Sequence, residues 1–212
     1  MSALTKVEIN KGHAAMSAMV KALIPSLTWR HHGIGVLQGY VSEGVDPEVR
    51  VHIWAPSLVK DGMRESGDIH DHRFDMVSHV IAGHIPHEEW FTHPDSERAL
   101  GTKYTILRLT HARAAAGNKF HGPTESTGER LLASFNPMTI SAGFTYRFPM
   151  GHFHRTPIHG SGFAVTLVEK HNQRNVSARI LHPIDKEPVM AFGHDMDYSQ
   201  VQSVISQALM IL

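Results

Sequence analysis

Short runs of alternating apolar and polar residues, each bounded by Gly, Pro, Asp or Asn, fill the middle of the chain. This pattern is typical of β-strands, because side chains on a strand alternate between two faces and turn residues end each strand. The runs that fit it are residues 35–41, 49–55, 74–82, 102–110, 130–136, 143–149, 162–170 and 177–183. Many short strands in succession restrict the fold to a β-sandwich or a β-barrel.

Two segments outside these runs have helical periodicity. Apolar residues recur at helical spacing over residues 17–27, where Pro25 limits the end of the helix, and again over residues 198–212. The sequence therefore predicts one all-β domain over residues 1–212, with a barrel core at about 35–183 and a helix on either side of it. The polar segment 112–129 is predicted to be a long loop.

The composition argues against several classes of partner. Lys and Arg number 20, Asp and Glu also number 20, and cysteine is absent from the 212 residues. No basic surface for nucleic acid and no apolar run long enough for a bilayer is expected. The lack of cysteine excludes disulfides, thiolate ligands and a cysteine nucleophile. The first residues mix Lys and Glu with apolar positions and lack a signal-peptide core, so a cytoplasmic protein is expected.

Histidine is the unusual component of this chain, with 18 residues. His70 and His72 open the run at 74–82, and on a strand they would share one face and converge on one metal ion. The same parity places Phe74 and Met76 toward a barrel interior, where they would line a substrate pocket. His79 falls on the opposite face, so it is expected at the surface or behind the ligands rather than on the metal.

A third metal ligand is expected from the stretch "GFTYRFPMGHFHR". A strand that ends in the turn Pro149-x-Gly151 would place His154 at the start of the returning strand, facing inward. His152 has the same parity as His154, and two alternatives remain open for it: an inward acid–base group or substrate contact, or exposure at the rim.

These stretches resemble the two motifs of the cupin family. The second motif, G-x5-P-x-G-x2-H-x3-N, matches at Gly143, Pro149, Gly151 and His154, with Ile158 where Asn is common. The first, H-x-H-x3/4-E-x6-G, matches at His70, His72 and Gly83, with Met76 where Glu is common. The resemblance implies a jelly-roll β-barrel with a metal ion held by residues of both motifs.

Because a thioether is a poor ligand for a hard divalent ion, the implied site is the three histidines His70, His72 and His154. Cupins with three histidines and no carboxylate include the thiol dioxygenases, which the contexts "IHDHRFD" and "HFHR" resemble. The resemblance implies a non-haem iron(II) dioxygenase that acts with O2 on a small thiol or another chelating anionic substrate. A possible homodimer is also implied.

A second class of function stays open beside the dioxygenase. Thiol dioxygenases such as cysteine dioxygenase carry a Ser-x-His-x-Tyr run at a distance where this chain has Leu167 to His171. Their substrate-carboxylate Arg corresponds, by position only, to Arg50. The alternative is a non-oxidative metal-binding cupin using zinc, nickel or manganese: an isomerase or lyase, a sensor, or a binding protein. A third possibility is a cupin that has lost catalysis and keeps its fold for association.

Two further predictions concern side chains outside the motifs. Arg108 shares a strand face with Tyr104 and Ile106 and would bind a substrate carboxylate if that face points inward, the alternative being a solvated side chain. Several other histidines fall in or near expected loops and are predicted to be exposed: His84, His87, His93, His111 and His121.

Overall fold

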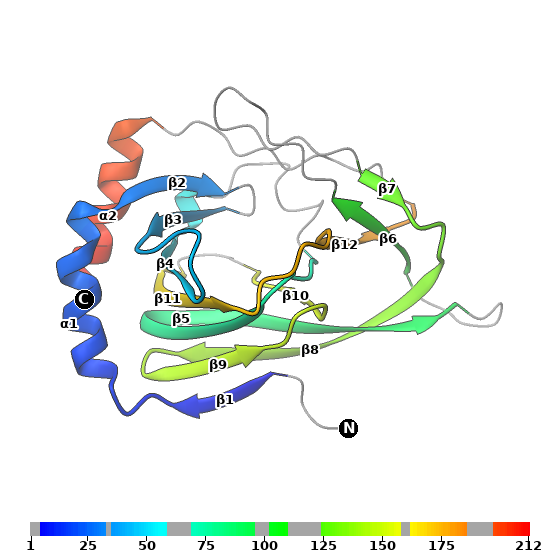
Figure 1. Cartoon of the computed structure of the whole chain (residues 1–212), viewed down its shortest axis with the longest axis horizontal. Coiled ribbons are helices and arrows are strands. Elements are labelled where there is room, and N and C mark those ends of the chain that lie inside the picture. Colours follow the sequence, from blue (N-terminus) through cyan, green and yellow to red (C-terminus); the bar gives the residue numbers. More distant parts are fainter. Residues whose placement is uncertain are drawn as a thin grey trace.

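Antiparallel strands curl into a half-barrel with two helices along one side in the computed structural model (Figure 1). The structure describes residues 5–32, 35–58, 69–95, 102–109, 124–157, 162–185 and 197–212. The strands are β1 (Lys6–Ile9), β2 (Thr28–His32), β3 (Val36–Tyr40), β4 (Glu48–Trp54), β5 (Asp75–Pro94), β6 (Lys103–Leu109), β7 (Thr124–Ser126), β8 (Leu131–Ser141), β9 (Phe144–Phe148), β10 (Phe153–Arg155), β11 (Ala164–His171) and β12 (Arg179–Pro183). The helices are α1 (His13–Leu23) and α2 (Tyr198–Ile211), with short 3-10 turns η1 (Ile24–Ser26) and η2 (Pro56–Leu58).

The long strand β5 belongs to both halves of the curled sheet. Its first part pairs with β11 and β9, in a layer that continues through β4, β3 and β2 on one side and β1 on the other. Its second part pairs with β8 and β10, and β8 leads on to β6, β7 and β12. One strand thus carries the chain around the corner between the two layers (Figure 1).

Gly83 stands at that corner. Its φ is +73°, a conformation that side chains disfavour, and a Cβ built on it would lie 1.9 Å from the carbonyl oxygen of Phe163. The glycine lets the backbone of β5 pass close to the segment that leads into β11, where the pairing shifts in register.

The two faces of the first layer are covered by different partners. The outward face packs against both helices, so that strand residues such as Ile53 and Leu167 share a cluster with Val20 of α1 and Ile205 of α2. The inward face carries a second apolar cluster that fills part of the half-barrel: Val36, Trp54, Phe74, Met76, Val80, Ile85, Ile140, Tyr146, Phe148, Ala164 and Val168. A functional site inside the half-barrel therefore has apolar walls on several sides.

The strand pattern in the sequence is confirmed in outline, because every predicted run contains a strand. β5 and β8 extend well beyond the runs 74–82 and 130–136, and four short strands (β1, β2, β7 and β10) were not predicted. The first helix begins at His13 and ends at Leu23 rather than spanning 17–27, whereas the C-terminal helix is confirmed.

The predicted loop at 112–129 is tested only in part. Residues 112–123 lie outside the described residues, and within the remainder Thr124–Ser126 form β7 rather than loop. In the described part of the chain, neither α1 nor α2 has the length and apolar character that a membrane-spanning helix needs.

Candidate metal centre

Three imidazoles meet inside the half-barrel. The ring nitrogens offered by His70, His72 and His154 all lie within 4.8 Å of one another, and Nε2 of His72 lies 2.9 Å from Nε2 of His154. The ring centroids of the three pairs are 4.7 to 5.0 Å apart. These separations allow the three nitrogen donors to hold one metal ion.

His154 reaches the cluster from β10, as the Pro-x-Gly turn predicts. Gly151 in that turn has a φ of +80°. The backbones of His70 and His154 exchange two hydrogen bonds, of 3.0 and 2.9 Å, and Gly151 N donates to the carbonyl of His72 at 3.0 Å. The two histidine-bearing segments are therefore joined directly, although they lie far apart in the sequence.

The expectation that His70 and His72 lie on the strand of residues 74–82 is wrong. β5 begins only at Asp75, and His70 instead forms isolated bridges to His154 and to Ile180 of β12. The segment is held away from β5 because Asp71 is buried and pairs with Arg179 of β12 at 2.6 Å. The two histidines converge through this crossing geometry, not through strand parity.

Burial favours the neutral form of the donors. The pKa of His72 and that of His154 are both lowered well below the usual histidine value, first by burial and then by the neighbouring His70. Neutral imidazole is the form that binds a metal ion, so these side chains are ready to act as ligands at neutral pH.

Aromatic rings enclose the cluster. Phe74 stacks on His72 with ring centroids 4.6 Å apart, and Phe148 stacks on His154 at 4.5 Å. Met76, at the position where cupins commonly have Glu, is buried in the same apolar cluster. Phe74 and Met76 thus line the interior beside the histidines, as the sequence predicts.

A pair of cations lies on the inner face of β4 and β11. Lys170 donates to Glu48 Oε1 at 3.0 Å, and Arg50 also forms an ion pair with Glu48. Arg50 donates in addition to Gln38 at 2.9 Å, and its Nε has no hydrogen-bond partner within the described residues. All three charged side chains are less than 15% exposed. We call Glu48, Arg50 and Lys170 the cationic wall, because two positive charges there face one carboxylate.

The cationic wall and the histidine cluster share one interior. Lys170 Nζ lies 4.5 Å from the centre of the Phe74 ring, the same ring that stacks on His72. His52 lies on the same inner face with an unpartnered Nε2 among the described atoms, and burial and Arg50 lower its pKa.

The charged groups of the cationic wall shift the pKa values of Glu48 and Lys170. Burial opposes ionisation of Glu48, but the hydrogen bond from Lys170 and the positive charges of Lys170 and Arg50 outweigh it and lower the pKa of Glu48. Burial and the nearby Arg50 lower the pKa of Lys170 to about 8, against the opposing effect of Glu48. Near neutral pH the wall therefore carries a net positive charge.

The other predicted site residues have different surroundings. His152 is half-buried beside Phe148, with ring centroids 6.3 Å apart, and its Nδ1 is buried without a partner in the described structure. Arg108 is exposed at the end of a strand face on which Tyr104 and Ile106 are buried, which favours the solvated alternative.

The prediction that His87 is exposed is wrong. It lies within β5 and is completely buried, with its ring 5.3 Å from that of His154, and burial lowers its pKa to about 4. Thr5 contacts both His87 Nε2, at 3.3 Å, and Glu89 Oε1, at 3.1 Å. The predicted exposure of His84 and His93 is confirmed, and His111 and His121 lie outside the described residues.

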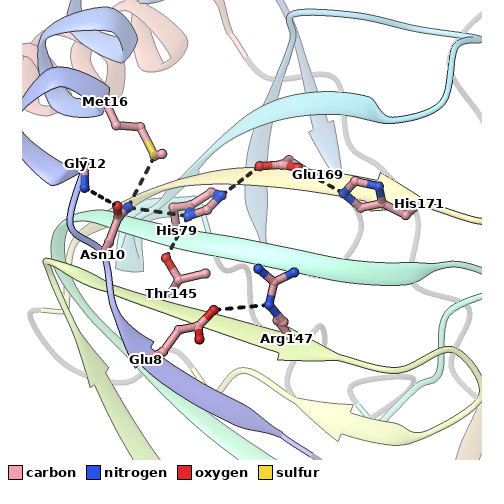
Figure 2. A network of polar contacts seen from close by, with 9 residues as sticks. All are labelled: Glu8, Asn10, Gly12, Met16, His79, Thr145, Arg147, Glu169 and His171. Carbon is pink, nitrogen blue, oxygen red and sulfur yellow. Dashed lines mark hydrogen bonds and ion pairs between the residues drawn. The ribbon is translucent and has the colours of Figure 1, made fainter.

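His79 belongs to a polar network on the outer face of the first layer (Figure 2). Its Nδ1 lies 2.7 Å from Thr145 Oγ1 and its Nε2 2.8 Å from Glu169 Oε1. Glu169 continues to His171 at 2.9 Å. Burial opposes ionisation of Glu169, but its contacts with His79 and His171 lower its pKa overall. This network is separate from the inward-facing histidine cluster.

Sequence reasoning did not anticipate Glu48, Lys170, His52 or the buried position of His87. The signal for Glu48 and His52 was the alternation along β4, which places Glu48, Arg50, His52 and Trp54 on one face, and Lys170 of β11 lies opposite Glu48. Both faces of β4 are covered, so the alternation alone did not indicate which face looks inward. The signal for His87 was that Ile85, His87 and Glu89 alternate as on one face of a strand. Pro86 made a break in the strand look more plausible, although β5 continues through it.

No protein-family model matches this chain. No curated protein matches it either. The function has therefore to be argued from the site itself.

Proposed function

We propose that this protein is a mononuclear metal-dependent dioxygenase with a cupin-type jelly-roll barrel. Its metal would be iron(II), and its substrates O2 and a small thiol or another chelating anion. The observation that carries the proposal is the convergence of His70, His72 and His154, three nitrogen donors beside an apolar cluster, with the pKa values of His72 and His154 lowered so that both are neutral. The two cupin-like motifs of the sequence and the curled antiparallel sheet support the same class of protein, a metal-dependent cupin.

The three histidines would hold the ion and leave part of its coordination sphere open. When bound, the ion would supply a Lewis-acid and redox centre. A donor set without a carboxylate adds no negative charge, so the centre would favour an anionic ligand. Phe74, Phe148 and Met76 would keep water away from it.

The cationic wall supports the anionic part of this proposal. Arg50 and Lys170 carry two positive charges against the single carboxylate of Glu48, and they lie in the interior that the histidines share. A small substrate that reaches the metal from this side would place an acid group against Arg50 and Lys170. The cationic wall would then orient the substrate, and Phe74 would pack between the wall and the histidine cluster.

Metal analysis and oxygen consumption test the proposal together. Freshly purified protein is expected to contain iron and, loaded anaerobically with iron(II), to consume O2 only when a chelating anion from a panel of small thiols and diketones is added. The His154→Ala variant serves as the inactive control. Protein that binds iron but consumes no O2 with any member of the panel would contradict the dioxygenase.

A non-oxidative metal-binding cupin is the second candidate, and one observation favours it. Over the stretch where thiol dioxygenases carry Ser, His and Tyr, the inward positions of β11 are Val168 and Lys170. Neither side chain reproduces that hydroxyl-rich network. A tightly held zinc, nickel or manganese ion in native protein, with anion binding but no O2 consumption, would support this candidate.

A further inference from the structure

One buried ion pair connects the segments that meet at the histidine cluster. Asp71 stands between His70 and His72 in the chain and is 4% exposed. Its carboxylate accepts a hydrogen bond from Arg179 Nε at 2.6 Å and another from the Arg179 backbone N at 2.5 Å. Both carboxylate oxygens are thus engaged by a single residue of β12.

The same arginine also reaches the turn that precedes His154. Arg179 Nη2 donates to the carbonyl oxygen of Gly151 at 2.7 Å. Its guanidinium lies 5.1 Å from the centre of the Phe153 ring, next to His154 in the chain. Arg179 therefore contacts both histidine-bearing segments at once, one through Asp71 and the other through Gly151.

Backbone hydrogen bonds fix Arg179 in this place. Asp71 N donates to the carbonyl of Arg179 at 3.0 Å, and Leu181 N donates to the carbonyl of Ile69 at 2.9 Å. β12 is in turn paired with β6. The side chain thus extends from a strand that is held on two sides, which gives it little freedom to follow a displaced segment.

We propose that Arg179 is a positioning residue for the metal centre: it clamps the segment of His70 and His72 to the turn before His154, and so sets the separation of the three donors. This role depends on the forked guanidinium, whose Nε and Nη2 point to two different acceptors. A lysine at this position keeps the charge but offers one point of attachment. The inference rests on the proposed metal site and is independent of whether the reaction is oxidative.

Cobalt(II) titration of the metal-free full-length protein tests the clamp, because the visible absorption of bound cobalt reports coordination geometry. Arg179→Met and Arg179→Lys are both expected to bind cobalt about 10–100-fold more weakly than the unaltered protein, with altered visible bands. Asp71→Asn, which keeps one accepting oxygen for Arg179, is expected to show a smaller loss.

Lys103→Met is the matched control. Lys103 pairs with Asp95 at 3.0 Å, and its side chain is as exposed as that of Arg179. Asp95 follows the end of β5, well beyond Glu89, which is the residue opposite His154. This variant is expected to lose some stability to unfolding but to bind cobalt within about twofold of the unaltered protein.

The outcomes separate this inference from the proposed function. If the unaltered protein binds cobalt and the Arg179 variants bind it equally well while unfolding more easily, Arg179 only supports β12 and the clamp is refuted. If the unaltered protein binds no cobalt, the metal site itself is refuted and the clamp with it. Should Arg179→Met fail to fold, Arg179→Lys decides by the same comparison.

Discussion

Nε2 of His72 and Nε2 of His154 lie 2.9 Å apart, within hydrogen-bond distance of each other. Burial keeps both rings neutral, so without an ion one nitrogen has to carry a hydrogen that it donates to the other. A bound cation would replace that hydrogen and accept a lone pair from each ring. At this short contact, metal binding would therefore place the one hydrogen of each neutral ring on Nδ1, without net release of a proton.

Replacing His154 with Ala is expected to weaken metal binding by at least about 100-fold, because one of three donors is lost from an already open site. Metal content after purification and competition with a chelating dye would measure the change. His84→Ala is the control, since His84 is exposed on β5. Retention of stoichiometric metal by the His154 variant would show that the ion, if any, is bound elsewhere.

Arg50→Met and Lys170→Met are each expected to weaken the binding of a small anionic ligand about 10–100-fold, since each removes one charge-assisted hydrogen bond donor. Either variant leaves Glu48 with one cationic partner, so the carboxylate does not become an isolated buried charge. Calorimetry on metal-loaded protein would measure the affinity. The affinity for the metal ion itself should not change, and equal anion affinity in all three proteins would speak against the wall as a binding surface.

Lys170 is expected to make stability rise with pH between about 8 and 10. Its pKa is about 8 in the folded protein and 10.5 in the unfolded chain, so in this range the unfolded state holds a proton that the folded state has released. The free energy of unfolding should increase by up to about 1.4 kcal/mol per pH unit relative to Lys170→Met. Urea unfolding at pH 8, 9 and 10 would measure it; parallel profiles for the two proteins would disprove the assignment.

His79→Ala is expected to destabilise the fold by about 1–3 kcal/mol, because Thr145 and Glu169 both lose their contact with the imidazole (Figure 2). Metal affinity should be unaffected, since the network lies on the outer face. Thermal unfolding and metal titration of the same sample would separate the two effects. A parallel loss of metal affinity would mean that the outer face is coupled to the histidine cluster.

Gly83→Ala is expected to cost about 2–4 kcal/mol, because the new Cβ would both strain the backbone and collide with the carbonyl of Phe163. Gly143→Ala is the matched control: its φ is +87°, yet nothing lies within 4 Å of the added Cβ. It should cost only about 1 kcal/mol, from strain alone. Chemical denaturation would compare the two, and equal losses would rule out a steric role for the Phe163 contact.

The strands were predictable from the sequence because alternation and turn residues are local signals. The same signals also gave the right turn before His154, where Pro149 and Gly151 determine the backbone path. Their ends were less predictable. Pro86 and the charged residues after it hid the continuation of β5, since tertiary pairing with β8 extends the strand through residues that local propensity disfavours.

The three histidines were predictable, but not the way in which they are brought together. The prediction that His70 and His72 share one face of a strand required β5 to begin before His70. The segment instead crosses to β10 and β12, because Asp71 pairs with Arg179. Such a long-range pair leaves no local trace in the sequence. The cationic wall was equally hidden, because β4 turns Val51 and Ile53 to the helices and the charged Glu48 and Arg50 to the interior.

β5 has one end in each layer of the half-barrel, and neither layer is complete without it. Loss of this strand from its neighbours would therefore dismantle both layers in the same event. The described sheet should melt as a single cooperative unit rather than layer by layer, and amide hydrogens on β4 and on β8 should exchange with similar protection.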